Sequence, residues 1–260
     1  MFRHYNFLLL VLSFFCGLSA QAADFSALKS TGQAEVIEVI NPYTVMLSSG
    51  KVARLSGLYF TDYTQDEAGP FAQTSVKILK DMLIGQKVEL YQTPKKDWGR
   101  VNRMGHELAH LVIPDKGLWV QGALLSLGLA KVQTSARNPE MAAQMLEIEA
   151  AARSSKTGIW ETEKILTPEE TEGAIGSFQI VEGKIVNAAV KQNRFYLNFG
   201  GNWRDDFTVS IAPEYKRAFT KNGMNPLDWG NKTVRVRGWI TSYNGPLIEI
   251  DHVEAIEFIK

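Results

Sequence analysis

The sequence predicts a mainly β protein with packed helices, an α+β fold built from two small five-stranded barrels. Three observations lead to this fold class. Residues 33–62 show short strands joined by turns, helical segments follow between residues 70 and 152, and residues 178–258 are almost entirely β. Short strands in such numbers commonly close into a small barrel. We therefore expect the two halves of the chain to share one kind of architecture.

The first barrel is expected to begin with three strands. Residues 33–40, 44–47 and 52–58 are rich in Val, Ile and Leu, which favour strands. The Asn41-Pro42 pair and the residues Ser48-Ser49-Gly50-Lys51 separate them, and both are typical turn sequences. This part of the chain therefore predicts three strands, the last two joined by a hairpin turn.

Helices and further strands are expected to complete the first half. A helix begins at Gly69-Pro70, because apolar residues follow near helical spacing at Phe71, Val76, Leu79, Met82 and Leu83. The remaining elements of this half are a strand at 88–91, a helix at 118–127 that stops at Gly128, and an Ala- and Glu-rich helix at 140–152.

The second half begins after an acidic segment. Residues 161–174 are polar and acidic, which predicts a linker between a first domain at 23–160 and a second at 175–260. The second domain is expected to hold five strands and one helix. The strands are 178–190, 194–199, 206–211, 233–240 and 246–258, and the helix lies within 213–222.

Composition sets limits on function. The chain has 260 residues, 45% of them hydrophobic, and a formal net charge of zero. This composition is typical of a globular protein. It excludes a wholly basic nucleic-acid binder and an acidic disordered chain, although a local basic groove remains compatible with it.

The N-terminus predicts export. Arg3 and His4 precede a short apolar run at 7–15, and Ala20-Gln21-Ala22 has the pattern of a cleavage site. We therefore expect residues 1–22 to be a removed signal peptide and the protein to be periplasmic or extracellular, not embedded in a membrane. Cys16, the only cysteine, lies within the signal, so the mature chain is expected to form no disulfide.

A sequence motif of zinc proteases lies in the middle of the chain. His106-Glu107-Leu108-Ala109-His110 matches H-E-x-x-H, which binds zinc when it lies on a helix. On a strand, the two histidines are about 13 Å apart and cannot hold one ion. The residues that follow, from Leu111 to Pro114, favour a strand. We therefore keep a zinc protease only as a remote alternative.

Several short fragments carry a family resemblance. In order, they are VINPYTV at 39–45, RLSGLYFTD at 54–62, DWGR at 97–100 with Leu108-Ala109 after it, LLSLGLA at 124–130 and GIW at 158–160. Over about residues 33–161, this series resembles the staphylococcal nuclease (thermonuclease-like) family. The resemblance implies a five-stranded OB-like barrel with packed helices. It also implies hydrolysis of phosphodiesters in DNA and RNA, usually with one calcium ion.

The resemblance assigns roles residue by residue. Arg54 and Arg100 fall on the two arginines that neutralise the transition state. Asp62 falls on the catalytic glutamate and is one methylene shorter. The two calcium aspartates fall on Tyr43 and Tyr59, which are neutral near pH 7. We therefore expect no calcium site, no other cofactor, and cleavage that is lost or much reduced.

Other readings of these positions stay open. The aspartate and glycine that open the family's calcium loop fall on Asn41 and Pro42. Asp66 and Glu67 are close enough in sequence to substitute for a lost carboxylate. Arg54 could instead pair with Asp62 or Glu67, and Arg100 could simply be a turn residue after a glycine.

Two sets of basic and aromatic residues are candidates for nucleic-acid binding. The first is Lys95, Lys96, Trp98 and Arg103, which suits phosphate contact and base stacking, although a solvated basic turn would look the same. The second lies on the later strands, which look like an OB-fold of the nucleic-acid-binding kind. Because Arg235 and Arg237 alternate with valines, we expect an exposed arginine face. This second set is Tyr196, Phe199, Trp203, Arg235, Arg237 and Trp239.

Three function classes remain. The first is a nuclease-like protein that binds nucleic acid, single-stranded in preference, or an envelope protein or other polymer, without calcium-dependent cleavage. The second is an active divergent endonuclease that uses Arg54, Asp62 and Arg100. The third is the zinc protease.

Overall fold

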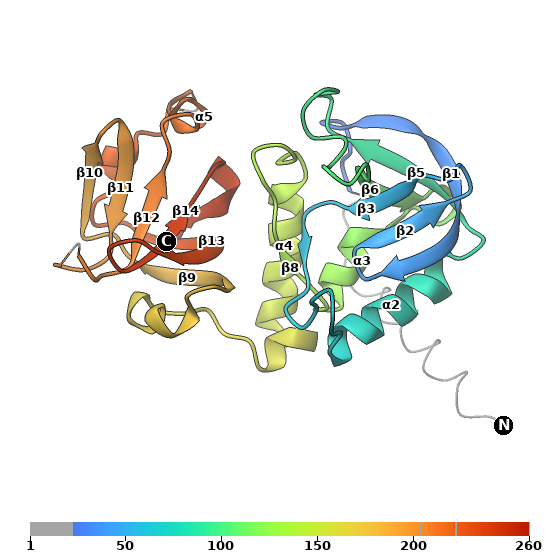
Figure 1. Cartoon of the computed structure of the whole chain (residues 1–260), viewed down its shortest axis with the longest axis horizontal. Helices are drawn as coiled ribbons and strands as arrows, with labels where there is room; N and C mark the ends of the chain where they lie inside the picture. The colour runs from blue at the N-terminus through green and yellow to red at the C-terminus, as the bar shows by residue number, and fades with distance from the viewer. Residues whose placement is uncertain (1–22, 203, 222, 260) are drawn as a thin grey trace.

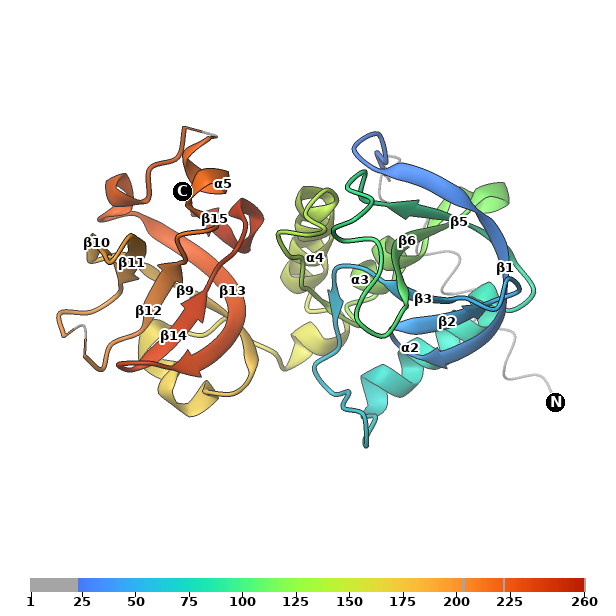
Figure 2. The same ribbon diagram turned by 45° about the horizontal axis from the view of Figure 1, so that its top comes forward.

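The computed structural model describes residues 23–202, 204–221 and 223–259. The predicted signal peptide at 1–22, with Cys16, and the candidate Trp203 lie outside these ranges. The described chain forms two β-barrels side by side, with helix α4 (Ala142–Ser154) on the side of the first barrel that faces the second (Figures 1 and 2). Within the described residues, no helix is long and apolar enough to cross a membrane.

The first barrel is closed by five strands. Their order is β3-β2-β1-β5-β6, and β3 also pairs with β6. The β3–β6 pair is parallel and the other pairs are antiparallel. The strands are β1 (Lys29–Asn41), β2 (Thr44–Leu47), β3 (Val52–Leu55), β5 (Lys87–Gln92) and β6 (Glu107–Ile113), and β7 (Leu118–Trp119) extends the sheet beyond β6. The predicted α+β fold with a five-stranded barrel is confirmed.

Three helices pack on this barrel, as predicted. They are α2 (Pro70–Leu83), α3 (Val120–Ser126) and α4. Helix α2 buries Leu79 and Leu83 in the barrel core, at positions that its apolar spacing indicated. Gly128 ends the α3 region with a left-handed backbone, φ 61°, the usual role of a glycine there.

The predicted strand 52–58 is wrong in its second half. It breaks after Leu55, and Gly57 has a φ of 82°. A Cβ on Gly57 would lie 2.8 Å from the Met145 sulfur, so only glycine fits this turn. Two residues then form β4 (Leu58–Tyr59), which pairs with β8 (Lys131–Val132), a strand that the sequence did not predict.

The second barrel has the same strand topology as the first. Its sheet runs β10-β11-β12-β14-β13, with β9 and β15 both on β13. The β12–β14 pair is parallel, as is β3–β6, and in both barrels a helix follows the third strand. The elements are β9 (Phe178–Lys184), β10 (Asn187–Lys191), β11 (Arg194–Asn198), β12 (Thr208–Ile211), α5 (Lys216–Thr220), β13 (Thr233–Ser242), β14 (Pro246–Glu249) and β15 (Ile256–Phe258).

Two of the predicted long strands are each divided. The strand predicted at 178–190 bends at Ile185 and Val186, whose amides donate to Lys232 O and Asn198 O. Its halves β9 and β10 therefore pair with different neighbours, β13 and β11. The strand predicted at 246–258 is interrupted after Glu249 by a turn and a short 3-10 helix.

The acidic segment 161–174 is ordered. The Leu166 amide donates to Ile180 O, and Leu166 O accepts from the Glu182 amide, so this segment lies along β9. Thr167 and Glu170 form a capping box. The 3-10 helices among the described residues are η1 (Pro114–Lys116), η2 (Gly158–Glu161), η3 (Pro168–Glu170), η4 (Glu172–Ala174), η5 (Pro226–Trp229) and η6 (Val253–Ala255).

Candidate functional site

Arg54 lies over an aromatic ring and, among the described residues, has no carboxylate partner. It is half-buried on β3, and its guanidinium carbon is 4.1 Å from the centre of the Tyr43 ring. Burial lowers the pKa of Arg54, and the nearby Tyr43 and Tyr63 act in the opposite direction. In the described part of the chain, Arg54 makes none of the ion pairs within 4.0 Å. The alternative pairing of Arg54 with Asp62 or Glu67 is therefore wrong.

Tyr43 is part of the barrel core. Its side chain is packed edge-on against Phe60, with 4.9 Å between ring centres, and against Tyr63 at 5.6 Å. The Tyr43 hydroxyl accepts a hydrogen bond from the Phe60 amide at 3.0 Å. Burial raises the pKa of Tyr43, so the hydroxyl is neutral at physiological pH. A neutral ring thus fills this position beneath Arg54.

Tyr59 faces the second barrel. Its ring centre is 4.8 Å from that of Phe178 and 5.7 Å from that of Trp239. Burial raises the pKa of Tyr59, and Glu163 adds to the shift. The two tyrosines thus make contacts in different places, Tyr43 in the core and Tyr59 between the barrels. Over residues 23–202, 204–221 and 223–259, no three His, Cys, Asp or Glu side chains are grouped as a metal site.

Asp62 caps helix α2. Its Oδ2 accepts from the Phe71 amide at 2.8 Å, and its Oδ1 accepts from the Ala72 amide at 3.0 Å. The cap position itself is Gly69, where a Cβ would lie 2.5 Å from the Asp62 carboxylate. The carboxylate therefore satisfies two free amides of the helix terminus. Its assignment as a catalytic base stays a prediction.

Arg100 is bound to the turn that carries it. Its Nε donates to Thr93 O at 2.7 Å, and one terminal nitrogen donates to Pro94 O at 3.3 Å. These contacts agree with the alternative interpretation, in which Arg100 is a turn residue. The backbone of the turn also lies next to β6, because the Leu108 amide donates to Arg100 O. The predicted catalytic role of Arg100 stays a prediction.

A basic aromatic cluster surrounds Trp98, whose side chain is 44% exposed. The Lys95 Nζ is 5.3 Å from the centre of the Trp98 ring, and the Arg137 guanidinium carbon is 5.6 Å from it. Both distances fit cation–π contacts. Lys96 and Arg103 are also exposed on this loop. Sequence reasoning missed Arg137, because its loop reaches Trp98 only through the fold, where Asn138 donates to Gly99 O at 3.0 Å.

The zinc-protease motif lies on a strand. Residues from Glu107 to His110 belong to β6, as the sequence predicted. His110 is buried, and burial lowers its pKa to about 3. Because a strand separates His106 and His110 by about 13 Å, the two rings cannot share one zinc ion. The zinc-protease alternative is therefore wrong.

The predicted exposed arginine face on β13 is wrong for Arg237. Arg237 is 4% exposed and contacts the first barrel. Arg235 is half-buried and pairs with Glu182 at 2.6 Å within its own barrel. Phe199 belongs to the second core, whereas Tyr196 is half-buried and Trp239 is 48% exposed. Burial removes Arg237 and Phe199 from the candidates for nucleic-acid contact.

The comparison with protein families agrees with this architecture. Residues 53–162 match the family model described as staphylococcal nuclease homologue. No curated protein matches the chain. The matched segment runs from β3 through the helices to the end of η2, and it includes Arg54, Asp62 and Arg100. The part of the first barrel from β3 onward, with its helices, is therefore similar to the staphylococcal nuclease homologues.

Proposed function

We propose that the protein is an exported nucleic-acid-binding relative of the nucleases, in which calcium-dependent cleavage of phosphodiesters is lost or much reduced. One observation carries the proposal. Arg54 is half-buried and has no carboxylate partner in the part of the chain that the structure describes, and the ring of the neutral Tyr43 lies beneath it. An unpaired guanidinium is suited to phosphate, but a neutral phenol cannot supply the charge that holds Ca²⁺.

The chemistry of cleavage needs more than arginines. A hard cation polarises a phosphate oxygen, and a carboxylate orients the attacking water. Tyr43 and Tyr59 stand at the positions that the resemblance gives to calcium aspartates, and both are held by aromatic contacts. Asp62, at the glutamate position, is engaged with two helix amides. These contacts support a loss of cleavage and leave phosphate binding intact.

Exposed groups support binding to single-stranded nucleic acid. Trp98 offers a ring for base stacking, and cations lie on the same loop. Trp239 offers a second exposed ring on the other barrel. The proposed binding residues are Arg54, Lys95, Lys96, Trp98, Arg100, Arg103, Arg137, Arg235 and Trp239.

Export rests on the sequence of residues 1–22, whose basic start, apolar run and A-x-A ending support cleavage after Ala22. We place the mature protein in the periplasm or outside the cell. There, extracellular nucleic acid is the expected ligand, and an envelope protein or another polymer is the alternative.

An active divergent endonuclease is the second candidate, favoured by the retention of Arg54 and Arg100. A fluorogenic nuclease assay separates the two. Single- and double-stranded DNA and RNA are incubated with the purified protein and Ca²⁺, Mg²⁺, Mn²⁺, Zn²⁺ or EDTA. We expect no cleavage under any condition. Cleavage that Arg100→Ala abolishes would establish the divergent nuclease instead.

A further inference from the structure

A set of buried charges lies between the two barrels, away from Arg54. We infer that the second barrel is permanently docked on the β8–α4 face of the first, and that Arg237 is the residue on which this docking depends. The protein would then act as one rigid two-barrel body, not as two domains that swing about a linker. This inference is independent of the proposed function.

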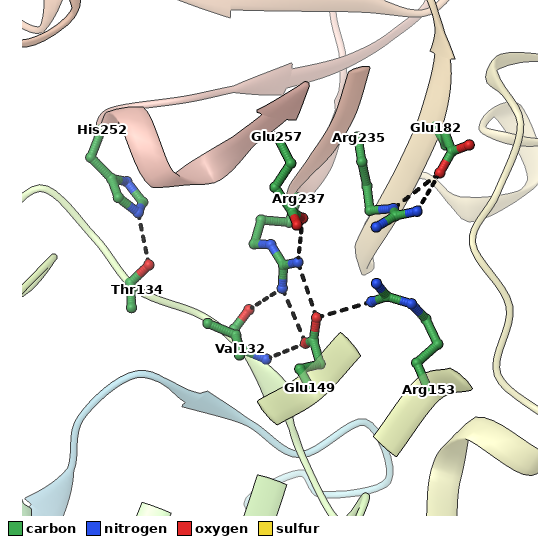
Figure 3. A network of polar contacts seen from close by, with 9 residues as sticks. All are labelled: Val132, Thr134, Glu149, Arg153, Glu182, Arg235, Arg237, His252 and Glu257. Atoms are coloured by element: carbon green, nitrogen blue, oxygen red, sulfur yellow. Dashed lines mark hydrogen bonds and ion pairs between the residues drawn. The ribbon is translucent and has the colours of Figure 1, made fainter. Parts of the chain in front are cut away.

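Arg237 reaches out of its own barrel (Figure 3). Its Nη1 donates to Val132 O at 3.2 Å and to Glu149 Oε1 at 3.1 Å. Its Nη2 lies 3.0 Å from Glu149 Oε2 and 2.9 Å from Glu257 Oε1. Glu149 Oε1 also accepts from the Val132 amide at 2.7 Å. The carbonyl and amide of Val132 on β8 are thus bound by side chains from the two different barrels.

These charges are removed from water. Arg237 is 4% exposed and Glu149 is 0% exposed. Burial alone would lower the pKa of Arg237, but Glu149 and Glu257 outweigh it and raise the pKa. Arg153 contributes a further contact to Glu149 at 3.2 Å. Removing one partner of such a buried pair is strongly destabilising, because the other charge stays without its counter-ion.

Two other groups of contacts fix the orientation of the barrels. His252 Nε2 lies 2.8 Å from Thr134 Oγ1, and the Ala136 amide donates to Asp251 Oδ2 at 3.2 Å. The second group is aromatic, since the Tyr59 ring packs against Phe178. With the Arg237 contacts, these make three groups of contacts of different kinds between the barrels, which restrict rotation as well as separation.

An apolar cluster adds to the attachment near the linker. Ile180 of β9 packs with the buried side chains of Ala152, Ile159 and Trp160 from the first barrel's helices. The linker itself is held, because Leu166 is hydrogen-bonded along β9. The helices of the first barrel therefore contact the second barrel through apolar side chains as well as through charges.

Cutting the linker tests the docking. A site for a specific protease is inserted between Lys164 and the half-buried Ile165 of the full-length protein, and the cut protein is analysed by size-exclusion chromatography. We expect the two wild-type fragments to elute together. Arg237→Leu, cut in the same way, should weaken their association by at least about 100-fold, as measured on dilution.

Arg235→Leu is the matched control. Arg235 lies on the same strand but pairs with Glu182 in its own barrel, so its fragments should stay together. Separation of the wild-type fragments would overturn the inference, and this result needs no variant to fold. Association unchanged by Arg237→Leu, or lost equally in Arg235→Leu, would also overturn it.

Discussion

The guanidinium carbon of Arg54 lies 4.1 Å above the ring of Tyr43. The sequence resemblance puts Arg54 at the position of a family arginine and Tyr43 at the position of a calcium aspartate. If this assignment holds, a retained cation lies over the ring that replaces an anion. In the proposed function, Arg54 binds phosphate through the polar edge of its guanidinium, which a cation–π contact does not use.

The Tyr43 hydroxyl is expected to act in stability, not in binding. Tyr43→Phe removes the acceptor of the buried Phe60 amide, which was bound at 3.0 Å. An unpaired buried amide costs about 1–3 kcal/mol. Urea denaturation should show a loss of this size, with oligonucleotide affinity unchanged because the ring remains under Arg54. A loss of affinity without a loss of stability would contradict this assignment.

Restoring carboxylates is not expected to restore calcium. In Tyr43→Asp/Tyr59→Asp, one carboxylate would enter the core beside Phe60, and the other would face Phe178. Neither environment supplies the six to eight oxygen ligands that Ca²⁺ takes. Isothermal titration with calcium chloride should show no saturable heat. Saturable binding that the wild type lacks would show that the two tyrosines are the only obstacle.

Asp62 is expected to act as a helix cap. Asp62→Ala removes the acceptor of the Phe71 and Ala72 amides and should destabilise the protein by about 1–2 kcal/mol. Asp62→Asn keeps an oxygen acceptor and should lose much less. Thermal unfolding of the two variants compares them directly. If Asp62→Asn and Asp62→Ala were equally destabilised, the charge and not the cap would be the important property.

His110 is expected to make stability depend on pH. The folded protein holds His110 neutral down to about pH 3, whereas the unfolded chain takes up a proton near pH 6.5. The contribution of His110 to the free energy of unfolding is therefore fully present above pH 6.5. It is lost as the pH falls toward 3, by about 1.4 kcal/mol per pH unit.

The variant His110→Leu isolates this effect. It has no imidazole to protonate in the unfolded state, so its unfolding free energy should fall less steeply between pH 6 and pH 4. Urea denaturation at several pH values measures both slopes. Identical slopes in the wild type and the variant would show that His110 is not held neutral.

Much of the secondary structure could be predicted from local sequence patterns. The strands that were predicted wrongly have physical causes. Apolar spacing located α2, and strand-favouring residues located β2 and β6. The bend at Ile185 was not visible, because its amide finds a partner at Lys232, far along the chain. A long strand that changes neighbours has the same sequence pattern as a straight one.

The misassigned site residues depend on contacts between distant segments. Strand alternation correctly put Arg235 and Arg237 on one face, opposite buried valines. It could not show that the first barrel covers only part of that face, at Arg237. Likewise, Asp62 caps a helix that begins eight residues later, with Gly69 at the cap position itself. No local capping pattern marks that relationship.

The most direct measurement is fluorescence anisotropy of an end-labelled single-stranded oligonucleotide titrated with the purified protein. It reports binding and, with time, cleavage. We expect the anisotropy to rise and to stay constant for hours in Ca²⁺ or EDTA. It should rise far less with Arg54→Ala or Trp98→Ala than with the control Lys77→Ala, which changes an exposed lysine of α2. A rise followed by a decay in Ca²⁺ would show calcium-dependent cleavage. The absence of any rise would contradict nucleic-acid binding.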